Sequence, residues 1–573
     1  MNNTASWYLG LELGSQGLAA ALWQWGTVHP HRFRWHQDGG ELESSGGDGN
    51  AIRDRIPMVI QFTGHSDQRG NSRQPTHRLQ ITVGDAARQD TPSPNCLRVE
   101  QFHTYLHRAI PCYSRQQKQW LPQISGPGGK PIPLHWFQRG LQLLLGQLLR
   151  QPGPMVVGDL TPQTLATALQ NLAGVILPHP TPWEEAYRFN LREAVLGAKL
   201  VANPEQIFLI PNPTALALAH PPTQPTLYLV SNEASTDLAI ALPDGQIFHQ
   251  SHPYGRAAFH ADIFYQLLYP QWLPEQDFLN AIAWDFPWPG NPDRRRREAA
   301  AVALTRHPMG EMVLTIAARV AQILHHQPTF TTQLGAQTWG ISREGIQEKI
   351  LRAWFESFNS VLNDLLSVAG VTTTDIETIY WQGDFLHSAL TELTQQLSWK
   401  LPHAQFQGVD TPLAMGAAQL PQRPNWGERA EHQYSDFFLV AELLRIAPSG
   451  DVTLDSLCGA LQRRGVNAKV CRDPQRAYGL TTMLQGQLPP GLIPDREDPW
   501  ILPQGAAAYR ALTATPLFTP NDNGTAYRFN HRQAQRLEQY LNLCLATTHQ
   551  TLQEPLSFNL CPQVLNWGEF LTD

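Results

Sequence analysis

The segment that decides the fold is residues 7–23, which read WYLGLELGSQGLAAALW. Residues 7–13 and 18–23 are apolar runs typical of buried strands, and a glycine-bounded turn, Gly14-Ser15-Gln16-Gly17, separates them. A Rossmann-type domain would place a helix directly after its glycine turn, so this opening differs from that fold. The sequence therefore predicts a β-hairpin at the start of the chain.

The same strand–turn–strand pattern returns later in the chain. Residues 227–231 and 238–242 form a second apolar pair, and a third strand over residues 246–249 follows an Asp244-Gly245 turn. A pattern that recurs in this way predicts two similar halves.

Helical and strand patterns fill the regions around these hairpins. Further strands are predicted at residues 207–210 and 376–382, and helices at residues 134–149, 182–201, 213–219, 345–369 and 388–397. A proline-containing break at residues 420–428 predicts a domain boundary. Beyond it, helices are predicted at residues 436–446, 454–464 and 533–547.

Six segments, in the same order along the chain, resemble motifs of the ATPase domain of the DnaK-type 70-kDa heat-shock chaperones. The most specific is residues 210–219, IPNPTALALA, which is similar to the family's INEPTAAALA. Residues 10–16, GLELGSQ, resemble the first phosphate loop, GIDLGTT, and residues 83–88, VGDAAR, resemble IGDAAK. The other three are residues 230–237 at the second phosphate loop, WQGD at 381–384 and TPLAMGAA at 411–418.

The resemblance implies an α/β, two-lobed actin-like ATPase fold over residues 1–420, with a central cleft between strand-rich lobes. It also assigns the family's nucleotide-binding positions to particular residues of this chain. These positions are Glu12, Gly14, Ser15, Gln16, Arg88, Asn212, Ser235, Asp237 and Gly383.

Several of these positions depart from the family pattern. In that family, glycine-rich hairpins cradle the phosphates, acidic residues hold the Mg²⁺ shell and a lysine stabilises the transferring phosphoryl group. The lysine is replaced by Arg88, the glutamate of the 210–219 motif by Asn212, and the leading aspartate of the second loop by Val230. The glycines of that loop are replaced by Asn232, Glu233 and Ala234.

These replacements predict a degenerate site, that is, a pseudo-ATPase with no catalytic residues and no metal. We expect ATP or ADP not to serve as a cofactor, although weak nucleotide binding without hydrolysis stays open. The six cysteines contain no CxxC pair, so no zinc site is expected either.

Net charge and apolar content limit the classes of partner that are expected for this chain. The net charge of −7 provides no global basic field for nucleic acid. No run of about 18 apolar residues and no basic leader are present, so the expectation is a cytoplasmic protein with no membrane partner.

The C-terminal region, residues 434–573, reads as a separate, mainly helical module that resembles a winged helix only loosely. Gln462, Arg463 and Arg464 could face DNA, but acidic and basic residues are balanced around them, which favours a protein partner. The predicted function is a non-catalytic protein-binding, assembly or chaperone-like scaffold with an unidentified partner. The alternative is a slow ATP-dependent chaperone, or a sugar-kinase-like ATPase, that uses altered ligands.

Overall fold

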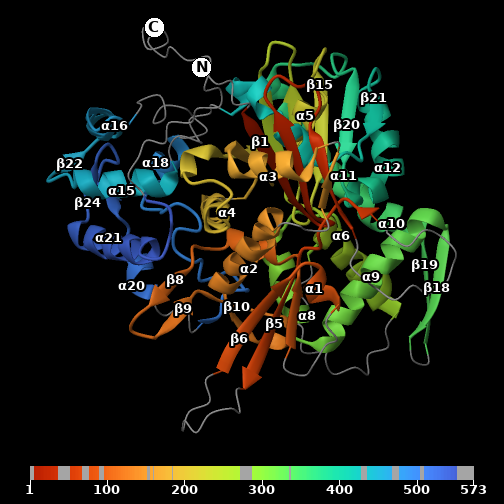
Figure 1. Ribbon diagram of the computed structural model, residues 1–573, viewed down its shortest axis with the longest axis horizontal. Coiled ribbons are helices and arrows are strands. Elements are labelled where there is room, and N and C mark those ends of the chain that lie inside the picture. The colour runs from red at the N-terminus through yellow and green to blue at the C-terminus, as the bar shows by residue number, and fades with distance from the viewer. Residues whose placement is uncertain are drawn as a thin grey trace.

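The chain has a mixed α/β fold (Figure 1). The computed structural model describes residues 6–36, 52–66, 77–89, 96–150, 155–158, 160–183, 185–271, 287–334, 337–427, 435–466, 477–503 and 509–551.

The first sheet is built on the opening hairpin, which forms where the sequence predicts it. Its core strands, in spatial order, are β3 (His31–His36), β2 (Gly17–Gln24), β1 (Trp7–Gly14), β13 (Leu172–His179) and β14 (Ile207–Pro211). The pairs β1–β2 and β2–β3 are antiparallel, whereas β13 and β14 continue in parallel on the other side of β1. Two short strands, β12 (Met155–Val157) and β4 (Ile52–Arg53), extend the sheet beside β3.

The second sheet repeats this arrangement strand for strand. Its spatial order is β17 (Ile247–His252), β16 (Thr236–Ala241), β15 (Thr226–Ser231), β20 (Thr378–Gln382) and β21 (Gln405–Gly408). Again the first three strands are antiparallel and the last two are parallel to the third. The repeat in the sequence is therefore a repeat of sheet topology.

Two helices lie between the sheets and form a shared core. Helices α5 (Asn212–Ala219) and α13 (Leu413–Ala417) pack on each other and against apolar residues of both sheets, which bury one continuous cluster. A Cβ on Gly416 would lie 1.9 Å from the carbonyl oxygen of Ala215, so only glycine allows this close approach. The shared core ties the two sheets together.

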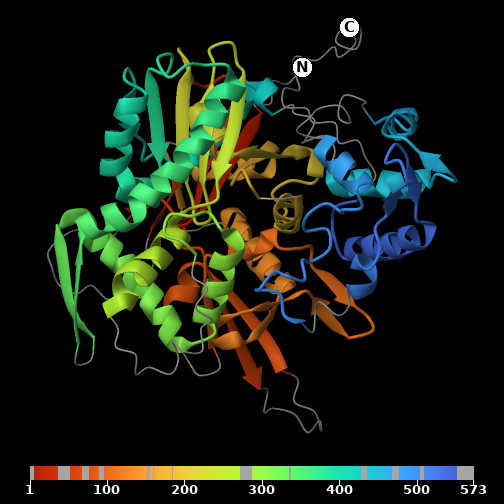
Figure 2. The same ribbon diagram turned by 180° about the vertical axis from the view of Figure 1, so that it is seen from behind.

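The outer faces of the sheets carry their own helices. Helices α2 (Leu134–Gly146) and α4 (Glu185–Gly197) share a core with the first sheet, and α11 (Arg352–Ala369) and α12 (Asp384–Lys400) share one with the second. The hairpin of β18 (Thr329–Leu334) and β19 (Gln337–Ser342) lies at one end of the molecule, opposite the C-terminal helices (Figure 2).

The C-terminal region contains short strands as well as helices. Its elements are α15 (Asp436–Ile446), β22 (Asp451–Val452), α16 (Leu454–Arg463), α18 (Ala477–Leu484), α20 (Arg510–Thr513), β23 (Phe518–Pro520), β24 (Tyr527–Phe529) and α21 (His531–Leu545). They surround one apolar cluster that also includes Ala186 and Phe189 of α4. We refer to described residues 435–551 as the C-terminal module.

The predicted boundary at residues 420–428 lies partly inside the core. Trp426 is buried between the sheets, and its Nε1 donates to the carbonyl of Gly245 at 2.6 Å. Residues 428–434 lie outside the described residues. No helix in the described part of the chain is both long and apolar enough to cross a bilayer.

Candidate functional site

The turns of the two equivalent hairpins line one cavity of about 250 Å³. Ser15 and Gln16 come from the β1–β2 turn, and Ser231 and Asn232 come from the β15–β16 loop. Asp384, at the start of α12, lies on the third side. We call this space the cleft cavity, because it is where the duplicated sheets face each other.

Glu12 is fixed by two partners inside this cavity. Its Oε1 lies 2.9 Å from an Arg55 guanidinium nitrogen, and its Oε2 accepts from the backbone N–H of Leu413 at 2.7 Å. Both side chains of the ion pair are largely buried, at 11% and 15% exposure for Glu12 and Arg55. The carboxylate therefore joins β1 to the N-terminus of α13.

The first turn reaches across the cavity to Asp384. The Ser15 hydroxyl donates to Oδ2 of Asp384 at 3.2 Å, and Nε2 of Gln16 donates to Oδ1 at 2.8 Å. Hydrogen bonds to a charged acceptor are stronger than neutral ones. The two halves are thus connected directly at the mouth of the cavity.

The second loop is closed by the side chain of Asn232. Its Oδ1 accepts from the backbone N–H groups of Ala234 and Ser235, at 2.9 and 3.0 Å. Its Nδ2 donates to the Ser235 hydroxyl at 2.9 Å and to Asp237 at 3.2 Å. The two backbone N–H groups that a phosphate loop would offer to an anion already have an acceptor.

Glu233 turns toward a helix start instead of the cavity. Its carboxylate accepts from Nε of Arg256 at 2.8 Å, and the backbone carbonyls of Asn232 and Glu233 accept from the N–H groups of Arg256 and Ala257. These residues begin α6 (Arg256–Asp262). Arg256 balances the charge of Glu233, and in turn the carboxylate raises the pKa of Arg256.

Asp237 is a buried carboxyl that links the two halves. It is fully inaccessible and accepts from Ser251, Ser235, Asn232 and the backbone N–H of Thr181, which precedes α4. Burial raises its pKa from 3.8 to about 6, although the hydrogen bonds that it receives act in the opposite direction.

Gly383 allows β20 to approach the second loop. Its φ is 117°, and a Cβ there would lie 2.3 Å from the carbonyl oxygen of Ser231. This backbone conformation strongly favours glycine. The approach also lets the Ser231 hydroxyl accept from the N–H of Leu386, in the first turn of α12.

Most of the residues assigned from the sequence come together here. Glu12, Gly14, Ser15, Gln16, Asn212 and Gly383 line the cleft cavity, and Ser235 and Asp237 lie directly behind Asn232. Arg88 does not line the cavity, because it is exposed in the last turn of α1 (Asp85–Gln89). The cation in the cavity is Arg55, and neither Arg55 nor the acceptor role of Asp384 was identified from the sequence.

The cavity does not fit the Mg-ATP that the resemblance implies. Ligand pockets usually measure roughly 300 to 1,000 Å³, and this one is smaller. Both oxygens of Glu12 are engaged, the Val230 side chain has no oxygen, and Asn232 satisfies the N–H groups of Ala234 and Ser235. Among the described residues, no group of three His, Cys, Asp or Glu side chains is arranged to hold a metal ion.

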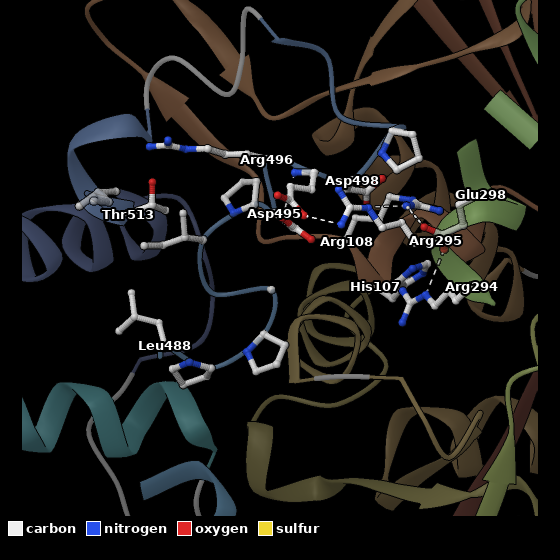
Figure 3. Close-up of a pocket in the computed structure, with 18 of the residues that line it drawn as sticks. His107, Arg108, Arg294, Arg295, Glu298, Leu488, Asp495, Arg496, Asp498 and Thr513 are labelled. Atoms are coloured by element: carbon white, nitrogen blue, oxygen red, sulfur yellow. Dashed lines mark hydrogen bonds and ion pairs between the residues drawn. The ribbon is translucent and has the colours of Figure 1, made fainter. Parts of the chain in front are cut away.

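A larger cavity, of about 870 Å³, lies where the C-terminal module meets the rest of the chain (Figure 3). We call it the junction cavity. Arg108 lies 2.5 Å from Asp498 and 3.4 Å from Glu298, and Arg295 lies 2.8 Å from Glu497. The pairs Arg108–Asp498 and Arg295–Glu497 join the module to the rest of the chain, and Arg108–Glu298 lies outside the module. Charges of both signs line the cavity, so it does not form a single-sign site for an ionic ligand.

No family model matches this chain, and no curated protein matches it. The resemblance to the 70-kDa heat-shock chaperones therefore stays a prediction from the sequence motifs.

Proposed function

We propose that residues 7–420 form a divergent two-lobed domain of the actin-like, 70-kDa heat-shock type, and that the protein is a non-catalytic protein-binding, assembly or chaperone-like scaffold. Two observations support the fold assignment. The two sheets share one strand order and one set of strand directions, and α5 and α13 pack between them.

The observation that carries the functional proposal is the closure of the second loop by Asn232. Transfer of a phosphoryl group depends on donors that are positioned for the phosphate oxygens. Here a side chain of the protein takes up the backbone N–H groups of Ala234 and Ser235. Without a nucleotide that binds two states differently, nothing drives the halves through a cycle.

The docking of the C-terminal module supports a static scaffold as well. Glu193 of α4 is 2% exposed and accepts from the backbone N–H of His549 at 2.8 Å and from Nε2 of Gln550 at 3.2 Å. Gln550 also donates to the carbonyl of Phe189 at 2.9 Å. A buried carboxylate with several donors holds the module in one position, which suits a surface that presents a constant face to a partner.

Small-angle scattering of the full chain, with and without Mg-ATP, tests the proposal together with a phosphate-release assay. We expect the same radius of gyration in both samples and no phosphate release above background. A nucleotide-dependent change in radius together with steady turnover would contradict the scaffold and restore an ATP-driven chaperone.

The alternative is a slow ATPase with altered ligands, and one observation favours it. Three carboxylates, those of Glu12, Asp384 and Asp410, line the cleft cavity. If they replaced the family's acidic residues, Asp410→Asn would abolish a measurable turnover and Asp244→Asn, on an exposed turn, would not. If no turnover is found in the unmodified chain, this alternative is excluded.

A further inference from the structure

Two buried thiols meet where the C-terminal module docks on the N-terminal half. Cys112 is the first residue of β8 (Cys112–Ser114), and Cys544 lies in the last turn of α21. Each residue is 1% exposed, α21 packs against β8, and each thiol shifts the pKa of the other. Residues far apart in the sequence thus place two neighbouring thiols at the docking interface.

The surroundings hold this pair in place. The hydroxyl of Tyr509 lies 3.8 Å from Sγ of Cys112, and the rings of Tyr509 and Tyr540 pack edge to face with centroids 5.7 Å apart. Both cysteines belong to the apolar cluster of the module. Packed strands and helices leave little freedom for side chains, so the two thiols stay in contact as long as the module is docked.

The two thiols differ in acidity. Hydrogen bonding from the Cys544 thiol, aided by the Tyr509 hydroxyl, lowers the pKa of Cys112, although burial acts in the opposite direction. Burial raises the pKa of Cys544. The thiolate is the reactive form of cysteine, so Cys112 is the sulfur that reacts first and Cys544 is the thiol that follows.

We propose that Cys112 and Cys544 form a reversible disulfide that fastens the C-terminal module to the N-terminal half when the protein meets a peroxide. The Cys112 thiolate attacks one oxygen of hydrogen peroxide, the O–O bond breaks, and a sulfenic acid forms as hydroxide leaves and is protonated to water. The Cys544 sulfur then attacks the Cys112 sulfur; its proton and the sulfenic hydroxyl leave as a second water. In total, two thiols are oxidised by two electrons and one peroxide is reduced to two waters.

The disulfide would change the link between the two parts from non-covalent to covalent. In the reduced protein the module is held by packing and by polar contacts such as Glu193 with Gln550. A cross-link between residues so distant in sequence removes much conformational freedom from the unfolded chain. This proposal does not depend on the scaffold function or on the state of the cleft cavity.

The test uses the full chain, reduced and then exposed to hydrogen peroxide, with free thiols blocked before digestion and mass spectrometry without reductant. We expect a peptide pair linked through Cys112 and Cys544, and a melting temperature about 5 °C higher that dithiothreitol returns to its starting value. Free or separately oxidised Cys112 and Cys544 in the folded protein would overturn the proposal.

Matched variants separate this link from other oxidation. Cys544→Ala should lose both the linked peptide and the rise in melting temperature, whereas Cys458→Ala, which removes a buried thiol from the same cluster, should keep both. A rise that persists in Cys544→Ala would contradict the proposal. If Cys544→Ala fails to fold, the linked peptide of the unmodified chain and its reversal by dithiothreitol decide the question on their own.

Discussion

The two hairpin turns of the cleft cavity occupy equivalent places in two sheets of the same topology, yet they are closed in different ways. The turn at residues 14–17 sends Ser15 and Gln16 across the cavity to Asp384. The loop at residues 231–236 folds around its own Asn232. One turn is therefore closed by the opposite half, and the other is closed by itself.

This difference shows that two turns in equivalent places of one sheet topology can satisfy their polar groups in different ways. Backbone N–H groups that face a cavity need an acceptor, and an anion or a side chain can supply it. In the second loop Asn232 is that acceptor, and in the first turn the side chains use Asp384 instead. The strands behind both turns keep the same pairing, because their buried apolar residues decide it.

The largest effect is expected from opening the self-closed loop. Asn232→Ala removes an acceptor from two backbone N–H groups and a donor from Asp237, and should lower the free energy of unfolding by about 3 kcal/mol. Chemical denaturation measures this. Asn521 offers a matched control, since its Oδ1 also accepts from two backbone N–H groups but in a hairpin turn far from the cavity. Asn521→Ala should cost about 1 kcal/mol.

An equal loss in the two variants would mean that Asn232 is an ordinary turn residue.

A smaller effect is expected from the bridge across the cavity. A double-mutant cycle with Gln16→Ala and Asp384→Ala should give a coupling energy of about 1 kcal/mol, because one partner is charged but the contact is exposed. The control is Gln246 and Asp244, an equivalent side-chain pair within one exposed turn, which should couple by less than about 0.5 kcal/mol. Coupling no greater than in that control would show that the two halves are not joined through Asp384.

A further effect is a dependence of stability on pH, and it concerns the carboxyl behind the self-closed loop. The folded protein holds the Asp237 proton with a pKa of about 6, above the ordinary 3.8, so the folded state binds this proton more tightly than the unfolded chain does. Its contribution to stability is therefore lost as pH rises from about 4 to about 6, and the free energy of unfolding should fall over that range.

Denaturation at several pH values checks this slope in the unmodified chain and two variants. In Asp237→Asn, the decrease in the free energy of unfolding that comes from Asp237 should be absent. In Ser251→Ala, which removes a hydrogen bond to the carboxylate, this decrease should move to higher pH. Identical slopes in the unmodified chain and Asp237→Asn would contradict the assignment.

Much of the frame could be predicted from the sequence, because it depends on local patterns. Both hairpins form where apolar runs flank a glycine or polar turn, and α15 occupies residues 436–446 as expected. The predicted helix at residues 388–397 instead begins at Asp384, because Gly383 with φ 117° supplies the turn into it. The sequence motif identifies Gly383 as a site position. Its backbone conformation could not be predicted, because it depends on the close approach of Ser231 in the folded protein.

The contacts of the site could not be predicted in the same way. Arg55 pairs with Glu12 across 43 residues, and nothing local to either residue indicates the partner. Arg88 was chosen by motif position, whereas the exposed end of α1 keeps it away from the cavity. Asn232 was recognised only as a lost glycine. Its role as an internal acceptor depends on the folded loop, although an Asn side chain that accepts from the backbone N–H two residues further on, as Asn232 does from Ala234, is a common turn pattern.

We propose that the cleft cavity closes on its own polar groups and does not bind a nucleotide with Mg²⁺. Calorimetric titration of the full chain with Mg-ADP and Mg-ATP tests it most directly, with Asn232→Gly titrated in parallel. We expect no saturable heat from the unmodified chain at millimolar nucleotide. A titration in this range detects even a Kd of 1 mM, which corresponds to a binding free energy of about −4 kcal/mol. Saturable binding to the unmodified chain with a micromolar Kd would show that the cleft cavity is a nucleotide site.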